Sequence, residues 1–389
     1  MPPARAPAIR YATFYGALFL LLGVYLPFWP VFLKSRGLDA AEIGLLFALL
    51  SWTKVVATPA IAQIADRSGR AKATLVIAAA LSLLFFTGMT GARGFWPILL
   101  IMLPAAACHQ ALTPIAESQT MAAVLRERLD YGRIRLWGSL TFILGTAGTG
   151  FLITGREPDL VLYLILGALA VTVLAALALP GRRDPPHESA RLSPLALLGK
   201  RRFLLFLGTV SLLQASHAVY YGFSALHWKA AGLSETTIGW LWAEGVAAEI
   251  LLFALSGAVV ARVGPPVLLA LAGLGGVLRW SVLAATTALP ALVAVQALHA
   301  LTFGAAHLAA MHFIARAAPP GLSATAQSLY TAISGGFAMG LSMLAAGALY
   351  QAYAGGAFLA MAALSAGGTV LALVLLRAQR RGGERAGSK

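Results

Sequence analysis

Twelve long apolar runs constrain this chain more than any other feature of its sequence. A helix needs about 20 mostly apolar residues to cross a bilayer, and each run has about that length. The runs are continuous and do not alternate, so they predict helices rather than the strands of a membrane barrel. Only 11% of the 389 residues are charged, which favours an all-α membrane protein. The runs lie at about 11–33, 41–62, 73–92, 96–120, 135–154, 160–180, 203–226, 236–260, 266–288, 290–315, 323–350 and 356–376.

One stretch of the sequence occurs twice, 195 residues apart. Residues 25–48 read YLPFWPVFLKSRGLDAAEIGLLFA and residues 220–243 read YYGFSALHWKAAGLSETTIGWLWA, with nine of the 24 positions identical. Besides apolar residues, the copies share a lysine, two glycines and a position that suits a helix N-cap. These pairs are Lys34 and Lys229, Gly37 and Gly232, Gly44 and Gly239, and Asp39 and Ser234. Matches at such residue types favour an internal duplication over chance.

The duplication predicts two six-helix bundles related by a pseudo-twofold axis, at residues 1–180 and 203–376. Residues 181–202 are the longest polar segment and would link the bundles, and residues 377–389 would be a tail. Of the 29 lysines and arginines, 22 lie in the two terminal segments and in alternate connections between the runs. This positive-inside pattern places the linker and both termini in the cytoplasm.

Several classes of protein are disfavoured by the sequence. The placement of the charges accounts for the net charge of +15, so we do not expect nucleic acid as a partner. The first run is too long for a signal-peptide core, and we expect it to be retained as a span. The single cysteine, Cys108, lies inside a run, which excludes a disulfide within the chain. The sequence contains neither an HExxH motif nor a GxxxxGK[ST] loop, and we expect no metal, no cofactor and no enzymatic activity.

Ionisable side chains inside the apolar runs are the candidate functional residues. Each costs about 3 kcal/mol to insert in mid-membrane, and such groups usually face a partner or a water-filled cavity. Both halves contribute, and together the residues predict a polar cavity. We interpret His109 as a packing residue. The others are Lys54, Glu117, Glu244, Glu249, Arg279, His217, His299 and His307.

A charged turn, ADRSGRAK, follows the second run at residues 65–72. A carboxylate there could accept hydrogen bonds from helix N-termini or from arginine. We expect Asp66 and Arg70 to hold the cytoplasmic ends of the spans together in one state of the protein, with Arg67 and Gly69 completing this gating turn. The alternative interpretation is an ordinary positive-inside loop.

Three strings carry a resemblance to a known family: LDYGRIRLWGS at 129–139, QASHAVYYGFS at 214–224, and LHALTF at 298–303 followed by HLAAM at 307–311. With twelve spans in two halves and the charged turn, the chain resembles the major facilitator superfamily. Within it, the chain is similar to the phenylpropionate permease family, which is related to lactose-permease-like proton symporters. The resemblance covers nearly the whole chain and implies a multi-pass transporter of a bacterial-type inner membrane.

The resemblance also implies roles for particular residues. Glu117 and Arg135 match, at the same separation of 18 residues, a Glu and an Arg that contact the sugar in the lactose-permease relatives. His299 matches a histidine of their proton-coupling cluster. The chain departs from these relatives three residues later, where Thr302 replaces a carboxylate.

From the residues and the resemblance together, we expect two sets of site residues. The first set would bind substrate: Lys54, Glu117, Arg135, Tyr220 and Phe223. The second set would couple protons: Glu249, Arg279, His299 and His307. We expect Arg279 to be the partner of Glu249, because their spans are consecutive, and Glu249 rather than His299 to carry the proton.

The predicted function is proton symport of a small aromatic carboxylate of the phenylpropionate kind by alternating access. A secondary transporter needs a midplane site and two alternately exposed faces, and it needs no phosphate loop. A first alternative is proton symport of a saccharide or nucleoside, and an alternative of another class is a non-transporting membrane sensor or assembly protein. The expected partners are a small solute, protons and the lipid bilayer, and we expect a functional monomer.

Overall fold

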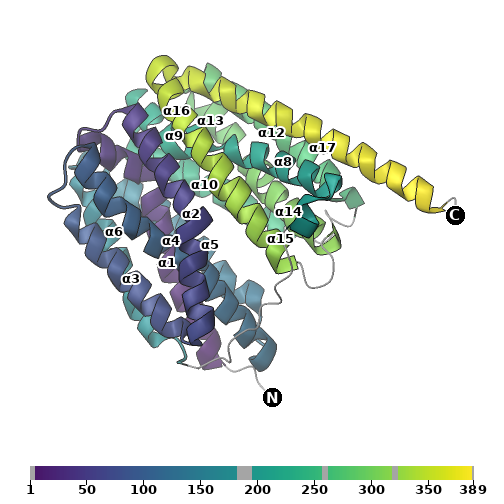
Figure 1. The fold of residues 1–389 in the computed structure, drawn as a ribbon. Helices are drawn as coiled ribbons and strands as arrows, with labels where there is room; N and C mark the ends of the chain where they lie inside the picture. Colours follow the sequence, from purple (N-terminus) through teal and green to yellow (C-terminus); the bar gives the residue numbers. More distant parts are fainter. Residues whose placement is uncertain (1–4, 182–194, 256–261, 318–322, 388–389) are drawn as a thin grey trace. The chain divides into compact units, whose positions relative to one another are not determined.

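The computed structural model describes residues 5–181, 195–255, 262–317 and 323–387, and every regular element in this part of the chain is helical (Figure 1). The first six helices are α1 Arg5–Ser35, α2 Ala40–Ser68, α3 Ala71–Gly88, α4 Phe95–Glu127, α5 Tyr131–Ile153 and α6 Asp159–Ala178. The short α7 Leu195–Leu198 is followed by α8 Arg201–Ala215, α9 Ala218–Ala230, α10 Glu235–Ala254 and α12 Pro265–Ala285. The predicted 181–202 linker falls largely on residues 182–194, which lie outside the described residues.

The last three predicted spans contain segments of irregular helix. One is built from α13 Leu289–Gln296, the π-helix η1 Ala300–Ala305 and α14 Ala306–Ala317. The next two contain α15 Ser323–Tyr330, the π-helix η2 Thr331–Ala338, α16 Met339–Tyr353, the 3-10 turn η3 Ala354–Gly356 and α17 Ala357–Gly387. Short π-helical segments within helices are often found at functional sites.

The number of spans agrees with the twelve apolar runs. Eleven helical stretches of the described residues are long and apolar enough to cross a membrane. The last of them, Thr325–Arg380, has 56 residues and is interrupted by the 3-10 turn between α16 and α17. It therefore contains the last two predicted runs, and the predicted all-helical membrane fold is confirmed.

The chain divides into two compact units. Unit 1 contains Met1–Glu188 and Ser224–Ala243, and unit 2 contains Ser189–Phe223 and Glu244–Lys389. The buried core of unit 1 includes Phe14 and Leu18 of α1, and that of unit 2 includes Phe206 and Phe313. The two bundles predicted at 1–180 and 203–376 stay a prediction.

The two units pack their helices in the same internal order. In unit 1, α1 packs against α5 and α6, and α3 packs against α4 and α6. In unit 2, α8 packs against η2 and α17, and α12 packs against α14 and α17. Counted by predicted span, each unit pairs its first helix with its fifth and sixth, and its third with its fourth and sixth. A duplicated sequence predicts such a repeated scheme of contacts.

The repeated stretch adopts the same turn in both copies. Gly37 and Gly232 have φ angles of 94° and 90°, a left-handed conformation that glycine adopts without the strain of a side chain. In each copy the amide of the following leucine donates to the carbonyl five residues back, at 3.3 Å and 3.0 Å. The glycines therefore terminate α1 and α9 with the same C-capping geometry.

Both copies also begin their second helix with a side-chain cap. The carboxylate of Asp39 accepts from the amide of Glu42 at 2.8 Å, and the carboxylate of Glu42 accepts from the amide of Asp39 at 2.9 Å. This reciprocal pair is a capping box, and it places the N-cap at Asp39, as the sequence predicts. In the second copy the hydroxyl of Ser234 accepts from the amide of Thr237 at 3.2 Å. A cap of this kind contributes about 1 kcal/mol to helix stability.

Glycines bring α5 and the start of α10 into backbone contact within unit 1. A Cβ atom on Gly150 would collide with the carbonyl oxygen of Glu235, and one on Gly239 would collide with that of Thr146. One turn beyond, the hydroxyl of Thr154 accepts from the amide of Thr236 at 3.0 Å. Small residues at helix crossings allow this close approach in membranes.

We expect Gly150→Ala to lower the free energy of unfolding by about 1–3 kcal/mol, because the added methyl group overpacks the α5–α10 crossing. The measurement is thermal unfolding of the detergent-purified protein. The matched control is Gly148→Ala on the same helix, where an added Cβ has no neighbour within 4 Å. Equal melting temperatures for the two variants would contradict the crossing described here.

Candidate functional site

A fully buried arginine organises the polar interior of unit 2. Arg279 of α12 has 0% of its surface exposed. Its Nη1 donates to Nδ1 of His299 at 3.1 Å and to Oγ1 of Thr302 at 3.0 Å, and its Nη2 donates to Oε1 of Gln296 at 2.8 Å. A buried charge is tolerated only when it is hydrogen-bonded or paired. These three acceptors, contributed by the span that contains η1, stabilise the guanidinium.

Aromatic rings enclose the same guanidinium. Its central carbon lies 4.6 Å from the ring centre of Tyr220 and 4.7 Å from that of Trp280, and cation–π contacts of this kind strengthen when water is excluded. The hydroxyl of Tyr220 accepts from Nε2 of Gln296 at 2.9 Å. Tyr220, which we expected to bind substrate, is 1% exposed and supports Arg279 in this structure. Phe223, the other aromatic residue of the predicted set, is buried and stacks on Tyr350 at 4.7 Å.

The hydrogen bonds fix the tautomers of two histidines. Arginine can only donate, so Nδ1 of His299 must accept and its proton lies on Nε2. In His217, Nδ1 lies 3.0 Å from the carbonyl oxygen of Leu213, so Nδ1 donates and Nε2 accepts. The Thr302 hydroxyl, 3.3 Å from that Nε2, therefore donates to His217 while it accepts from Arg279. Thr302 takes part in the network as a neutral bridging group.

Glu249 joins this network through His299. The carboxylate oxygen Oε2 of Glu249 lies 3.6 Å from Nε2 of His299, the nitrogen that carries the proton. We expected Arg279 to be the partner of Glu249, and the contacts found here run from Glu249 to His299 and from His299 to Arg279. Consecutive spans bring the two residues to one network, but the side chain between them comes from the span that contains η1.

His307 extends the row of rings on the same face of the tenth span. The ring of Phe303 stacks on His299 at 5.3 Å, and the ring of His307 follows at 6.3 Å from Phe303. The spacing of eight residues between the two histidines predicts this common face. His299 is 8% exposed, whereas His307 is exposed.

Unit 1 contains a second polar cluster, around Lys54 of α2. Lys54 is half-buried, and within the described residues no carboxylate pairs with it. Its neighbours come from α4, where His109 lies within electrostatic range of Lys54. Oγ1 of Thr53 lies 3.2 Å from Oε1 of Gln110, which also donates through its Nε2 to the carbonyl oxygen of Leu50 at 3.1 Å. These hydrogen bonds hold α4 against the turn of α2 that carries Lys54.

Aromatic side chains lie next to the Lys54 cluster. The ring of Tyr25 lies 6.2 Å from His109 and stacks on Trp29 at 5.6 Å. Phe86 of α3 packs edge-on against both Tyr25 and Trp29. We interpreted His109 as a packing residue and did not place Tyr25 in the site. Both are polar residues in apolar runs, which is the signal that could have included them.

A third group lies toward the ends of α4 and α5 in unit 1. Glu117 is half-buried and lies within electrostatic range of Arg135. The guanidinium of Arg135 lies 3.8 Å from the ring centre of Phe19 and 5.5 Å from that of Tyr15. The predicted pair is thus brought together, with aromatic residues of α1 on one side.

The charged turn after α2 is formed by its glycine. Gly69 has a φ angle of 62° and caps α2, with its amide donating to the carbonyl oxygen of Asp66 at 3.3 Å. The side chains of Asp66, Arg67 and Arg70 are exposed, and within the described residues the Asp66 carboxylate makes no hydrogen bond or ion pair. The gating role of this turn stays a prediction.

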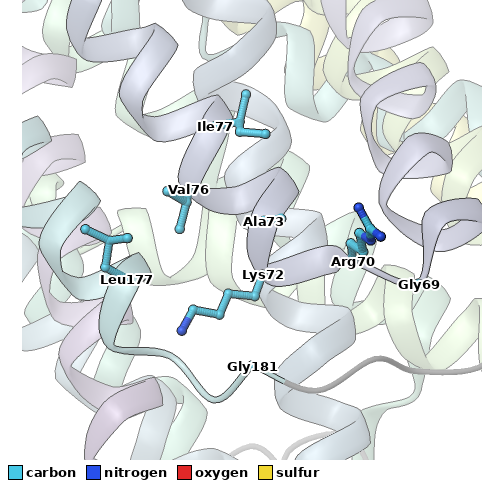
Figure 2. A pocket seen from close by; sticks show the side chains of 8 residues that line it. All are labelled: Gly69, Arg70, Lys72, Ala73, Val76, Ile77, Leu177 and Gly181. Carbon is cyan, nitrogen blue, oxygen red and sulfur yellow. The ribbon is translucent and has the colours of Figure 1, made fainter.

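A cavity of about 570 Å³ opens beside this turn, between α3 and the end of α6. Figure 2 shows the Lys72 side chain pointing toward Gly181, whereas the Arg70 side chain points to another side of the chain. The two cations therefore do not converge on one point. The remaining lining is mostly apolar, with Val76, Ile77 and Leu177.

Comparison with known proteins identifies the family. The model of the MFS_1 like family matches residues 8–360. The chain belongs to this family of the major facilitator superfamily. It is therefore a membrane transporter of a small solute and not an enzyme, as the sequence predicts.

The names of individual relatives of this MFS protein refer to different solutes. The chain is 36% identical over 346 residues to the "Probable 3-phenylpropionic acid transporter" of Escherichia coli K12, covering 87% of this chain and 89% of the relative. It is 28% identical to the "Maltose permease" of Geobacillus stearothermophilus, covering 88% of each chain. A crystal structure of a mutant of the nucleoside transporter NupG has the same fold, with a TM-score of 0.85, 18% identity, and coverage of 95% of this chain and 99% of that chain.

We expect Gln296→Leu to destabilise this MFS protein, because it removes the acceptor for Arg279 and the donor to Tyr220 together. Leaving buried polar groups unpaired costs about 1–3 kcal/mol, and more where the group is charged. The measurement is again thermal unfolding in detergent. The control is Gln214→Leu on α8, a half-buried glutamine whose side chain has no hydrogen bond within the described residues. If the two variants unfold alike, Gln296 does not stabilise Arg279.

Proposed function

We propose that this transporter is a proton symporter that takes up a small aromatic carboxylate by alternating access. It would lie in a bacterial inner membrane as a functional monomer, with both termini in the cytoplasm and without nucleic acid or a cofactor. Lys54, Glu117, Arg135, Tyr220 and Phe223 would form or support the substrate site. Glu249, Arg279, His299 and His307 would couple transport to protons, and the Asp66 turn would act as a gate.

The observation that carries the substrate class is the environment of Lys54. It is a cation within a span that has no carboxylate partner among the described residues; His109 lies within electrostatic range of it, and the Tyr25 ring lies 6.2 Å from that histidine. An unpaired charge in a span is costly, and a carboxylate ligand would compensate it while its ring packs against the aromatic residues. The 36% identity to a transporter named for 3-phenylpropionic acid supports the same substrate class.

A neutral saccharide or nucleoside is the second candidate. It is favoured by the Glu117–Arg135 group with its aromatic neighbours Phe19 and Tyr15, which offers both hydrogen-bonding groups and stacking surfaces. The names of the maltose permease relative and of NupG point the same way. Uptake of labelled aromatic acids, sugars and nucleosides into proteoliposomes, with and without a pH gradient, distinguishes the candidates and tests proton coupling.

The position of the protons in the unit 2 network supports Glu249 as the coupling residue. His299 already carries a proton on Nε2, and its Nδ1 accepts from the permanently charged Arg279. A second proton on His299 would have to displace that hydrogen bond and bring two positive charges together. A carboxylate has about four lone-pair sites on its two oxygens. Glu249 can therefore take up a proton while the bond between His299 and Arg279 remains intact.

We expect Lys54→Gln to raise the concentration of aromatic carboxylate that gives half-maximal uptake by about thirtyfold or more. The reason is that losing a desolvated charge partner costs at least about 2 kcal/mol. The measurement is uptake into proteoliposomes with 3-phenylpropionate. In the wild type, the methyl ester should compete poorly with the acid. The control is Lys34→Gln, which removes an exposed lysine at the end of α1. Equal competition by acid and ester in the wild type would favour the saccharide or nucleoside.

We expect Glu249→Gln to abolish uphill accumulation while preserving exchange of substrate between equal pools, because the amide cannot release a proton. His299→Asn keeps a neutral hydrogen-bonding side chain, and we expect it to retain part of the accumulation. Both are measured in proteoliposomes with an imposed pH gradient. If the Glu249 variant still concentrates substrate and the His299 variant does not, the proton site is the histidine.

A further inference from the structure

A cavity of about 490 Å³ in unit 2 has no role in the function proposed above. It lies where α8 and α12 begin and α14 ends, beside a late turn of α17. Among the described residues, its lining combines three basic side chains with two phenylalanines and contains no carboxylate. The lining residues are Lys200, Arg202, Phe203, Pro265, Phe313, Arg316, Ala317 and Gln379.

The basic side chains of this cavity have no acidic partner in the part of the chain that the structure describes. Lys200, Arg202 and Arg316 are exposed, and none of them forms an ion pair with a carboxylate of the described residues. Nη2 of Arg202 donates to the carbonyl oxygen of Ala378 at 3.0 Å, which holds this guanidinium at the rim. Three uncompensated cations around one opening create a positive potential that favours an anion.

The backbone adds to this potential. Lys200 is the N-cap residue of α8, and its side chain does not cap the helix. Within the described residues the amides of Arg201 and Arg202 make no hydrogen bond, whereas that of Phe203 donates to the carbonyl oxygen of Lys200. The two unpaired amides lie at the positive end of the helix dipole, which favours negative charge. The C-terminal end of α14 also lies at the cavity and contributes the negative end of a helix dipole, but its last turn carries the positive charge of Arg316. The three basic side chains and the two helix ends together leave the opening positively charged.

The floor of the cavity is apolar. Phe203 and Phe313 are each 3% exposed, and Phe313 stacks on Phe206 at 4.2 Å. Phe203 lies at the start of the apolar stretch Arg201–Ala230, and Phe313 lies near the end of Leu289–Ala317. These two span ends are at a membrane surface. On the charge pattern of the sequence this is the cytoplasmic surface. A cationic rim above an apolar floor suits an amphiphile better than a free inorganic anion.

The cavity of Figure 2 lies at the start of α3, which the 195-residue register pairs with the start of α12, and the two linings share one register pair, Arg70 and Pro265. It offers a weaker anion site, because its two cations point to different sides. The lining with three cations distinguishes the unit 2 cavity from it.

We propose that the unit 2 cavity binds the head group of an anionic phospholipid of the cytoplasmic leaflet. The phosphate would lie among Lys200, Arg202 and Arg316 at the start of α8, and an acyl chain would follow the apolar surface beside Phe203. Basic pockets between the ends of membrane helices recognise such head groups.

The test is native mass spectrometry of the full chain in detergent, titrated with phosphatidylglycerol and, separately, with phosphatidylcholine. The wild type should retain phosphatidylglycerol preferentially. Lys200→Gln/Arg316→Gln should weaken its binding about 25-fold, since each basic residue near an anionic lipid contributes about fivefold in affinity. The matched control, Arg93→Gln/Arg156→Gln, removes two exposed arginines from other connections with the same change of net charge. The control should bind as the wild type does.

Three results would overturn the proposal. If the control variant lost as much affinity for phosphatidylglycerol as the test variant, the lipid would be attracted by the net charge of the protein alone. Equal retention of both lipids by the wild type would remove the role of the anionic head group. Competition by inorganic phosphate at the same concentration as the lipid would assign a free-anion site. If the double variant does not remain monodisperse, Lys200→Gln alone should give the fivefold loss, and Arg316→Lys should bind normally.

Discussion

The charge of Arg279, held inside a membrane helix, is the constraint on which the polar interior of unit 2 depends. A guanidinium does not lose its proton in a protein, so the fold must supply acceptors rather than neutralise it. Gln296, His299 and Thr302 supply them from one span. The Tyr220 ring supplies a face. Once these groups face Arg279, the tautomers of His299 and His217 and the direction of the Thr302 hydroxyl follow without further freedom.

Lys54 presents the opposite case in unit 1. Both residues are cations within spans, but the protein supplies three acceptors to Arg279, whereas Lys54 has a histidine within electrostatic range and no carboxylate partner among the described residues. A charge held by acceptors of the protein stabilises the fold, and a charge left with an open partner position is available to a ligand. This difference assigns substrate recognition to Lys54 in the proposed function and support of the coupling network to Arg279.

The sequence predicted the local structure well where one residue type determines it. Asp39 and Ser234 cap the helices that follow them, as predicted, because a cap depends on neighbours along the chain. The matching glycines Gly37 and Gly232 adopt the same positive φ angles. Polarity within an apolar run could have marked Gln296, Tyr25 and His109 as candidates, but their partners could not be predicted, since a partner in the network depends on the rotation of whole helices. The π-helix at Ala300–Ala305 changes that rotation beside His299, and no sequence period indicates it. The same limit explains why Glu249 and Arg279, on consecutive spans, meet through a third one.

The neutrality of Thr302 has a consequence for coupling. A carboxylate at this position, as in the lactose-permease-like relatives, would compensate the positive charge of Arg279 directly. The hydroxyl of Thr302 transmits a hydrogen bond but carries no charge. Compensation of Arg279 then depends on acids further away, Glu249 through His299 and Glu244 through its electrostatic interaction with the guanidinium. A proton bound at Glu249 raises the positive charge of the network by one unit.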